Sequence, residues 1–532
     1  MPSIKEAFRR GRKRGGAALT MPFYGALAGF TSAGWPLWPL AWIALIPLMR
    51  RLQTTPSDEG HRKTLARAAI AGAGFGFGYH LSALFWTNSL HPLTWLGLSL
   101  DQSRAAALGM WLTWATLGAF LWAILAMAHR AIAPPQARWT RRLAAALAWG
   151  AILLAYSALN ELYPPWTLLC YGQAASPLAL KLAGALQDAS PWGFDALIVW
   201  VNAELARGWR LAQDRRYSGL RLAVISAALP ALAAGSAIWP QTPTDGDLPT
   251  PLAVAQGNLS IETIRASSTL TEASEAAYLT PLKQARWPRG TLIALPEEGP
   301  APEWISLRAP QRHEVARKWT ELAKSRGWRI ISGAATMDEG WTARYYNSVI
   351  QIDSRGGFQA FHKRRLVPIG ESTPRLGGLL PENWLSEVMR VLGAPPYENL
   401  FAAGARDQTL LQENGESSST NATRIGPLVC LELAYPQLSA DERRAGARLL
   451  INVSNLGWFH GDRLMAAQFL AMGQFRAAEN HLPLAIAAND GPSAIIDAQG
   501  RVLALAPSAT ATTLFAPGRL KQIPKQAPKQ LQ

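Results

Sequence analysis

Long stretches without a charged residue constrain this chain more than any other feature of its sequence. The first runs from Gly15 to Met49, and the Gly-Trp-Pro-Leu-Trp-Pro segment at 34–39 would break a helix there, so we expect two short spans. Five further apolar runs are each close to the ~20 residues that a membrane-crossing helix needs. They are Ala68–Trp86, Ala105–Ala128, Leu143–Asn160, Pro191–Ala206 and Leu222–Trp239. We therefore predict an α-helical membrane bundle of about seven spans within residues 1–240.

The basic residues are distributed unevenly around these predicted spans. The chain has 52 Lys and Arg against 36 Asp and Glu, and only 17% of its residues are charged. If the N-terminus is cytoplasmic, 20 basic residues precede or connect the spans on the cytoplasmic side, and only Arg104 and Lys181 lie on the other side. This asymmetry follows the positive-inside rule, so we predict a periplasmic location for the residues after 240. A nucleic-acid-binding protein would also be basic, but it would lack the long uncharged runs.

Two alternatives to this topology stay open. The basic residues before Gly15 and the apolar run after it could form a cleaved signal peptide, although the length of the run and the later spans argue against cleavage. The run Pro191–Ala206 contains Asp195 and Glu204, and the uncharged segment Leu162–Leu180 could cross the membrane in its place. If both segments crossed, the remainder of the chain would change sides.

The composition and hydrophobic pattern of the sequence change after residue 240. Charges become frequent, and short apolar runs alternate with helical patterns, which indicates an α/β domain over residues 241–510. Residues 511–532 read as a basic, disordered tail. Three helices are predicted in the α/β domain, at Gln311–Ser325, Gln437–Ala445 and Asp462–Asn480.

Three residues of this domain follow predicted strands and could act together. Glu297, Lys363 and Cys430 each lie at the carboxyl end of an apolar run, where open α/β sheets place their sites. Taken singly, Cys430 could be an inert buried thiol, Glu297 a helix N-terminal charge and Lys363 part of a solvated basic run. Taken together, they supply a nucleophile, a base that removes its proton and a cation that stabilises an oxyanion. The histidines have no metal-ligand spacing and the chain has no glycine-rich phosphate loop, so we predict neither a metal nor a cofactor.

The order of these residues and their flanking motifs resembles the nitrilase superfamily. The multi-span N-terminal half in addition resembles the apolipoprotein N-acyltransferases of the bacterial inner membrane. The resemblance rests on further motifs, namely Val254-Ala255-Gln256-Gly257-Asn258, Tyr346-Asn347-Ser348, Val367-Pro368-Ile369-Gly370-Glu371, Ser454-Asn455-Leu456-Gly457-Trp458-Phe459 and Arg476-Ala477-Ala478-Glu479-Asn480. It implies an α-β-β-α sandwich on a transmembrane helical bundle.

The resemblance also implies roles for individual residues. They are Cys430 as nucleophile, Glu297 as general base, Lys363 as the oxyanion-stabilising residue, Glu371 and Glu432 as supporting carboxylates, and Trp239 near the site of lipid access. Two positions depart from the family pattern: Leu431 replaces a common tyrosine, and Glu298 adds a second carboxylate beside the expected base. The family's eighth membrane helix has no counterpart after Asn489.

The resemblance implies an acyltransferase with two lipid substrates. A membrane phospholipid would donate the acyl chain to Cys430, and the N-terminal amine of a diacylglyceryl prolipoprotein would accept it. Two other functions remain: a membrane-tethered nitrilase-like amidase or lipid hydrolase that uses the same three residues, and an inert binding or scaffold protein.

Overall fold

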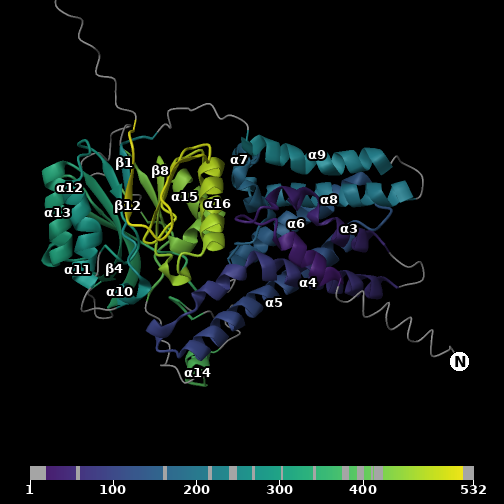
Figure 1. Ribbon diagram of the computed structural model, residues 1–532, viewed down its shortest axis with the longest axis horizontal. Coiled ribbons are helices and arrows are strands. Elements are labelled where there is room, and N and C mark those ends of the chain that lie inside the picture. Colours follow the sequence, from purple (N-terminus) through teal and green to yellow (C-terminus); the bar gives the residue numbers. More distant parts are fainter. Residues whose placement is uncertain are drawn as a thin grey trace, which may run out of the picture.

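A computed structural model gives the fold of the chain. It describes residues 20–54, 60–159, 164–213, 219–238, 248–265, 270–300, 304–338, 343–368, 370–373, 381, 383–391, 401–408, 411–412 and 423–518. Figure 1 shows two halves side by side, a bundle of helices and an α/β half. Trp239, the residue expected near the site of lipid access, lies outside the described residues.

Helices make up the first half. Residues 20–29 are helical, and the chain then turns at Gly34 before the short helices α2 and α3, as a helical hairpin requires. The helices that follow the hairpin are longer. The bounds are α2 (Ala41–Ala44), α3 (Ile46–Gln53), α4 (His61–Ala83), α5 (Leu100–Ile132), α6 (Trp139–Leu159), α7 (Pro177–Leu186), α8 (Trp192–Gln213) and α9 (Gly219–Ile238). Among the described helices, α5 alone is long and apolar enough throughout to cross a membrane by length and composition.

Close packing of α4 against α5 depends on glycine. A Cβ atom at Gly72 would lie 2.3 Å from the carbonyl oxygen of Trp122, and one at Gly76 would lie 2.5 Å from the Trp122 side chain. The Trp122 ring stacks on Phe75 with 5.3 Å between the ring centroids. Small residues on one helix therefore make room for a large aromatic side chain on the other.

The acidic residues of the weakest predicted span have partners. Asp195 on α8 accepts hydrogen bonds from the backbone N–H groups of Leu169 and Cys170, and Glu204 forms an ion pair with Arg142 at 2.5 Å. Both acidic side chains of α8 are therefore satisfied by partners, as a buried charge requires. The alternative segment Leu162–Leu180 is not one continuous helix over its described residues, which contain a short 3₁₀ helix and the start of α7.

The second half contains two β-sheets packed face to face (Figure 1). Within the described residues, the first sheet has the strand order β12-β1-β2-β4-β5-β6, with β3 beside β4, and the second has the order β11-β10-β9-β8-β7. The bounds are β1 (Leu252–Gln256), β2 (Leu292–Ala294), β3 (Ile305–Ser306), β4 (Arg329–Asp338), β5 (Arg344–Ile352), β6 (Phe358–His362), β7 (Ile425–Val429), β8 (Leu449–Ser454), β9 (Leu484–Ala488), β10 (Ala494–Ile496), β11 (Val502–Leu505) and β12 (Thr512–Ala516).

Helices cover both outer faces of the paired sheets, which gives the expected α-β-β-α order. Successive side chains of β1 point to opposite faces of the sheet and contribute to two hydrophobic cores. Ala253 and Ala255 face the outer helices, whereas Leu252 and Val254 face the second sheet. The helices are α10 (Ile261–Arg265), α11 (Leu270–Ser274), α12 (Thr280–Gln284) and α13 (Glu314–Arg326) by the first sheet, α15 (Pro436–Arg444) and α16 (Arg463–Asn480) by the second, and α14 (Trp384–Val391) apart from them. The three helices predicted from the sequence correspond to α13, α15 and α16 and are confirmed.

Helix α16 joins the two halves. The side-chain oxygen of Gln468 accepts hydrogen bonds from the indole N–H groups of Trp86 (2.9 Å) and Trp166 (2.7 Å), and its amide group donates to the Ala83 carbonyl at 2.8 Å. One hydrophobic core extends from the helical half to the second sheet across α16. The α/β half is therefore held in one orientation on the helical half.

The predicted start of the C-terminal tail is wrong. Residues 512–516 form β12, which pairs antiparallel with β1 from Leu252↔Ala516 to Gln256↔Thr512. The alternating pattern of this short strand was too weak to recognise, because its exposed face carries Thr and Phe rather than a regular polar series. The rest of the predicted tail, from 519 onward, lies outside the described residues.

Candidate active site

Cys430 lies at a sharp turn directly after strand β7. Its backbone has a φ of 49°, a left-handed conformation that is uncommon for a residue other than glycine. The Asn452 side chain holds this turn by donating hydrogen bonds to the carbonyl groups of Leu428 (3.3 Å) and Cys430 (3.2 Å). Strain of this kind is typical of functional sites, where it fixes the direction of a reactive side chain.

Glu297 follows β2 and is buried beside Cys430. One carboxylate oxygen accepts a hydrogen bond from the Asn347 side chain at 2.6 Å, and the other accepts one from the backbone N–H of Asn455 at 3.0 Å. The Cys430 thiol lies close enough to this carboxylate for the two groups to interact electrostatically. Glu297 is therefore held in place and can receive the proton of Cys430.

Lys363 follows β6 and is completely buried. Its Nζ atom lies 2.8 Å from Oε1 of Glu371 and 3.7 Å from Oε1 of Glu297. Glu371 in turn accepts hydrogen bonds from the Asn347 side chain at 2.6 Å and from the Val367 backbone N–H at 2.7 Å. The structure thus brings together the three residues that the sequence singled out, with Glu371 orienting the lysine.

Burial and the neighbouring charges together shift the pKa values of the three residues. Burial raises the pKa of Glu297 to about 7, against the opposing effect of the Lys363 cation. Burial also raises the pKa of the Cys430 thiol, and the Glu297 carboxylate raises it further. Burial alone would lower the pKa of Lys363, but Glu371 and Glu297 raise it above its ordinary value, so this residue stays a cation. These shifts favour the protonated form of the Cys430 thiol.

The neighbouring carboxylate Glu298 occupies a different position. It has a φ of 64°, and its Oε2 atom accepts a hydrogen bond from the Asn455 side chain at 2.8 Å. Glu297, by contrast, contacts both Lys363 and Cys430. The left-handed turn directs the two consecutive carboxylates to different partners, and the geometry favours Glu297 as the base.

This difference gives a direct test of the two carboxylates. We expect Glu297→Gln to lower the rate of acyl transfer by at least about 100-fold, because a neutral amide cannot accept the thiol proton. Glu298→Gln keeps a side chain that can bond Asn455, so its rate should stay within about tenfold of wild type. Steady-state rates of the two purified variants provide the measurement. A larger loss of rate in Glu298→Gln than in Glu297→Gln would identify Glu298 as the base.

Glu432 supports the site through the backbone rather than beside the thiol. One carboxylate oxygen accepts hydrogen bonds from the backbone N–H groups of Arg364 (2.7 Å) and Arg365 (3.0 Å), and the other accepts one from Val429 at 2.8 Å. It therefore ties the segment after Lys363 to the residue before Cys430. Its role is to position both loops.

Sequence reasoning assigned no role to two asparagines that complete the site. Asn347 on β5 bridges Glu297 and Glu371, and Asn455 after β8 contacts both Glu297 and Glu298. Both occur in motifs that stand out in the sequence. The signal that could have identified them is an amide side chain next to a predicted buried strand, because a buried amide needs hydrogen-bonding partners.

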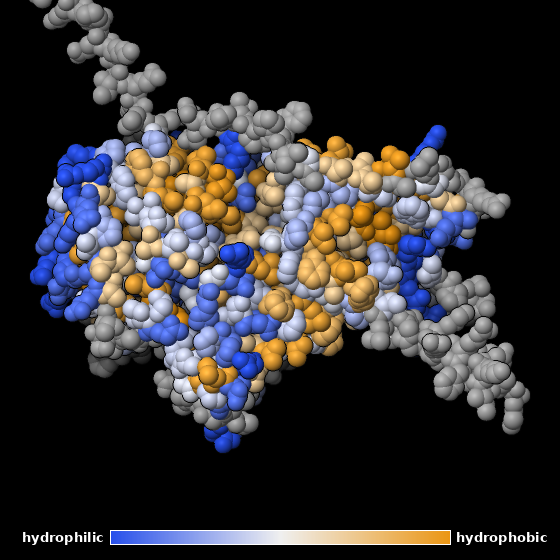
Figure 2. Space-filling view, in the orientation of Figure 1, coloured by the Kyte–Doolittle hydropathy of each residue, from blue (hydrophilic) through white to orange (hydrophobic). Residues whose placement is uncertain are grey.

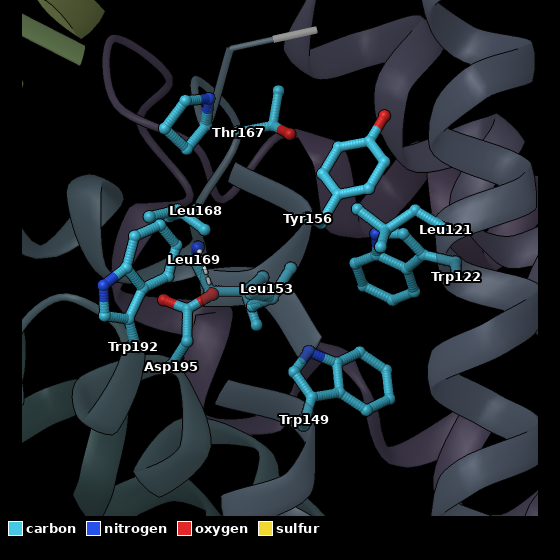
Figure 3. Close-up of a pocket in the computed structure, with 11 residues that line it drawn as sticks. Leu121, Trp122, Trp149, Leu153, Tyr156, Thr167, Leu168, Leu169, Trp192 and Asp195 are labelled. Carbon is cyan, nitrogen blue, oxygen red and sulfur yellow. Dashed lines mark hydrogen bonds between the residues drawn. The ribbon is translucent and has the colours of Figure 1, made fainter. Parts of the chain in front are cut away.

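A small cavity also lies inside the helical half (Figure 3). Trp122, Trp149, Tyr156 and Trp192 are among its lining residues, and Asp195 lies at its edge with a hydrogen bond to Leu169. Its volume of about 20 Å³ has room for about one water molecule. This cavity is too small for an acyl chain, so Asp195 and the surrounding rings serve the packing of the bundle.

Comparisons with known proteins agree with this architecture. Residues 253–524 match the carbon-nitrogen hydrolase family, and residues 24–204 match the apolipoprotein N-acyltransferase N-terminal domain. An apolipoprotein N-acyltransferase of Brucella melitensis is 31% identical over 91% of this chain and 84% of its own length. Enzymes of the same name from Nostoc sp. and Bordetella bronchiseptica are 28% and 30% identical, over 89% and 90% of this chain and 88% and 86% of their own. Among solved structures, a nitrilase-superfamily protein of Saccharomyces cerevisiae covers 53% of this chain and 97% of its own, with 15% identity and a TM-score of 0.35.

The α/β half is a carbon-nitrogen hydrolase domain, with an acidic residue, a lysine and a cysteine gathered at the strand ends. This domain and the matching N-terminal domain show that the chain belongs to the apolipoprotein N-acyltransferase family. It is an acyltransferase of the bacterial membrane that acts in lipoprotein N-acylation.

Proposed function

We propose that the acyl group passes from a membrane phospholipid to Cys430, and from there to the N-terminal amine of a diacylglyceryl prolipoprotein. The observation that carries this proposal is the arrangement of Glu297 and the buried cation of Lys363, 3.7 Å apart, beside the strained turn of Cys430. A base whose pKa is about 7 can both accept and return a proton near neutral pH.

In the first step, sulfur forms a bond to an ester carbonyl carbon while Glu297 takes the thiol proton. Lys363 stabilises the oxyanion of the tetrahedral intermediate. When the intermediate collapses, the ester C–O bond breaks, and Glu297 returns the proton to the oxygen of the leaving lysophospholipid. The product is a thioester on Cys430.

In the second step, the amine of the acceptor attacks the thioester carbonyl. Glu297 takes a proton from the amine, the C–S bond breaks, and the thiolate of Cys430 leaves and is protonated again. A thioester suits this sequence because it reacts readily with amines. The product is an amide on the N-terminal cysteine of the lipoprotein.

We also propose that the helical half spans the bacterial inner membrane several times, with the α/β half in the periplasm. Large apolar side chains are exposed on this half. They include Phe23, Leu27, Ile70, Leu108, Leu112, Phe120, Ile124, Leu147, Leu154, Leu178, Val224, Ile225 and Leu232. Figure 2 shows orange, hydrophobic patches on the face of this half that it draws. Exposed apolar surface of this extent is costly in water and is favourable in lipid. The 20 basic residues on one side of the predicted spans support the orientation.

Isolation of the acyl-enzyme tests the proposed chemistry. Phospholipid alone should convert the purified protein to a form with the mass of one added acyl chain, and neutral hydroxylamine should remove it, because hydroxylamine cleaves thioesters. A peptide with an N-terminal diacylglyceryl cysteine should then discharge this form into an N-acyl product. If the adduct instead decays equally fast with and without peptide and releases free fatty acid, the protein is a lipid hydrolase.

The orientation has a separate test. A reporter that is active only after export should be active when fused after Thr244, because the predicted spans leave that residue in the periplasm. The same reporter fused after Arg138, between two predicted spans, serves as the cytoplasmic control. A cytoplasmic signal after Thr244 would favour an additional crossing at Leu162–Leu180.

A further inference from the structure

Three consecutive cations follow β6, and two of them are neutralised. Lys363 is paired with Glu371 and lies near Glu297. Arg364 forms an ion pair with Glu442 at 2.6 Å, and both side chains of that pair are buried. Lys363 therefore faces the group around Cys430, and the charge of Arg364 is balanced by Glu442.

Arg365 differs from its two neighbours. Within the described part of the chain, no carboxylate forms an ion pair with it. Its Nη2 atom donates a hydrogen bond to the Ala158 carbonyl at 3.3 Å, and its guanidinium lies 5.2 Å from the ring centre of Tyr435. The residue is partly exposed. A guanidinium carries five N–H donors, so most of those on Arg365 are available to an anion.

The position of Arg365 relates it to the nucleophile. Its backbone N–H binds the carboxylate of Glu432, which also binds the backbone N–H of Val429, the residue before Cys430. Tyr435, under the guanidinium, lies at the end of the short 3₁₀ helix that Cys430 begins. The arginine is therefore connected to the turn of the nucleophile on two sides.

The contact of Arg365 with Ala158 indicates where the guanidinium lies relative to the membrane surface. Ala158 lies at the C-terminal end of α6, a helix that begins after Arg138 and, in the proposed topology, ends at the periplasmic surface. The phosphate groups of the outer leaflet lie at this surface. A cation there also interacts favourably with the C-terminal end of the helix dipole.

We propose that Arg365 binds the phosphodiester group of the donor phospholipid and positions the adjacent ester for attack by Cys430. This inference rests on the proposed function, because it assigns a binding group for the first step only. Guanidinium binds phosphate oxygens in a bidentate manner, whatever headgroup the phosphate carries. The acceptor has no phosphate, so Arg365 distinguishes the lipid that donates the acyl chain from the lipoprotein that receives it.

The test compares two acyl donors in detergent micelles, dioleoylphosphatidylethanolamine and the phosphate-free ester p-nitrophenyl oleate. For Arg365→Gln, we expect kcat/KM for acylation by the phospholipid to fall by about 10- to 100-fold, mainly through KM, because a charge-assisted hydrogen-bonded contact is lost. Acylation by the p-nitrophenyl ester should be unchanged. Arg365→Lys keeps the charge without the bidentate geometry and should give an intermediate loss.

Two further measurements separate binding from a structural role. Arg317→Gln, at an exposed position on α13 far from the helical half, should leave both donors unaffected. The rate at which the diacylglyceryl peptide discharges a preformed acyl-enzyme should be the same in Arg365→Gln and wild type. An equal loss with both donors, or no loss with either, would overturn the inference while the acyl-enzyme mechanism stands. Absence of any acyl-enzyme in the wild type would instead overturn the proposed function and the inference together.

Discussion

Cys430→Ala is expected to abolish acyl transfer, with a loss of at least about 10,000-fold, the order of magnitude for removal of an enzymatic nucleophile. The Cys430 thiol lies close to Glu297 and Lys363, whose charges act on it, and the alanine methyl group can form no thioester. N-acylation of a diacylglyceryl peptide, followed by mass spectrometry, measures the loss. The variant should also gain no acyl mass when it is incubated with phospholipid.

The chain offers a matched control for this experiment. Cys170 is its other cysteine, and it is fully buried in the helical half. Cys170→Ala removes a single sulfur atom from the packing and should keep most of the activity, with a modest loss of stability. Substantial turnover in Cys430→Ala would rule out covalent catalysis by this residue. Loss of turnover only in Cys170→Ala would indicate that the reaction takes place in the helical half.

Lys363→Met should lower the rate of acyl transfer by about 100- to 1,000-fold, because it removes the cation that stabilises the oxyanion. It should also destabilise the protein by about 3 to 5 kcal/mol, the cost of leaving a buried charge without its partner. Both Glu297 and Glu371 lose their cation in this variant. Single-turnover acylation rates and thermal unfolding measure the two effects separately.

The stability effect of Lys363→Met should depend on pH. Burial already raises the pKa of Glu297 from 4.5 to about 7, and removal of the lysine raises it further. When a carboxyl group binds its proton more tightly in the folded state than in the unfolded state, the protein becomes less stable as the pH rises above the pKa of the unfolded state. The loss of melting temperature should therefore be larger at pH 8 than at pH 5. Lys324→Met, at an exposed position on α13, is the control and should show no such difference.

Much of the α/β half could be predicted from the sequence because its elements have local signals. Helices α13, α15 and α16 follow from their residue patterns. Glu297, Lys363 and Cys430 could be grouped because each follows an apolar strand, and strand ends meet at one edge of a sheet. Strand β12 has a weak alternating pattern, and only its pairing with the distant strand β1, as at Leu252↔Ala516, identifies it.

The sequence alone predicted Glu297, Lys363 and Cys430 as a group and gave their order along the chain, because reactive side chains stand out after apolar strands. The arrangement of these residues depends on the tertiary fold. Glu297 rather than Glu298 contacts Cys430 because a left-handed turn separates two adjacent carboxylates, and no local pattern encodes that turn. Arg365 likewise differs from Arg364 because Glu442, distant in sequence, pairs with only one of them. Burial and pairing depend on contacts between distant segments, and these exist only once the chain has folded.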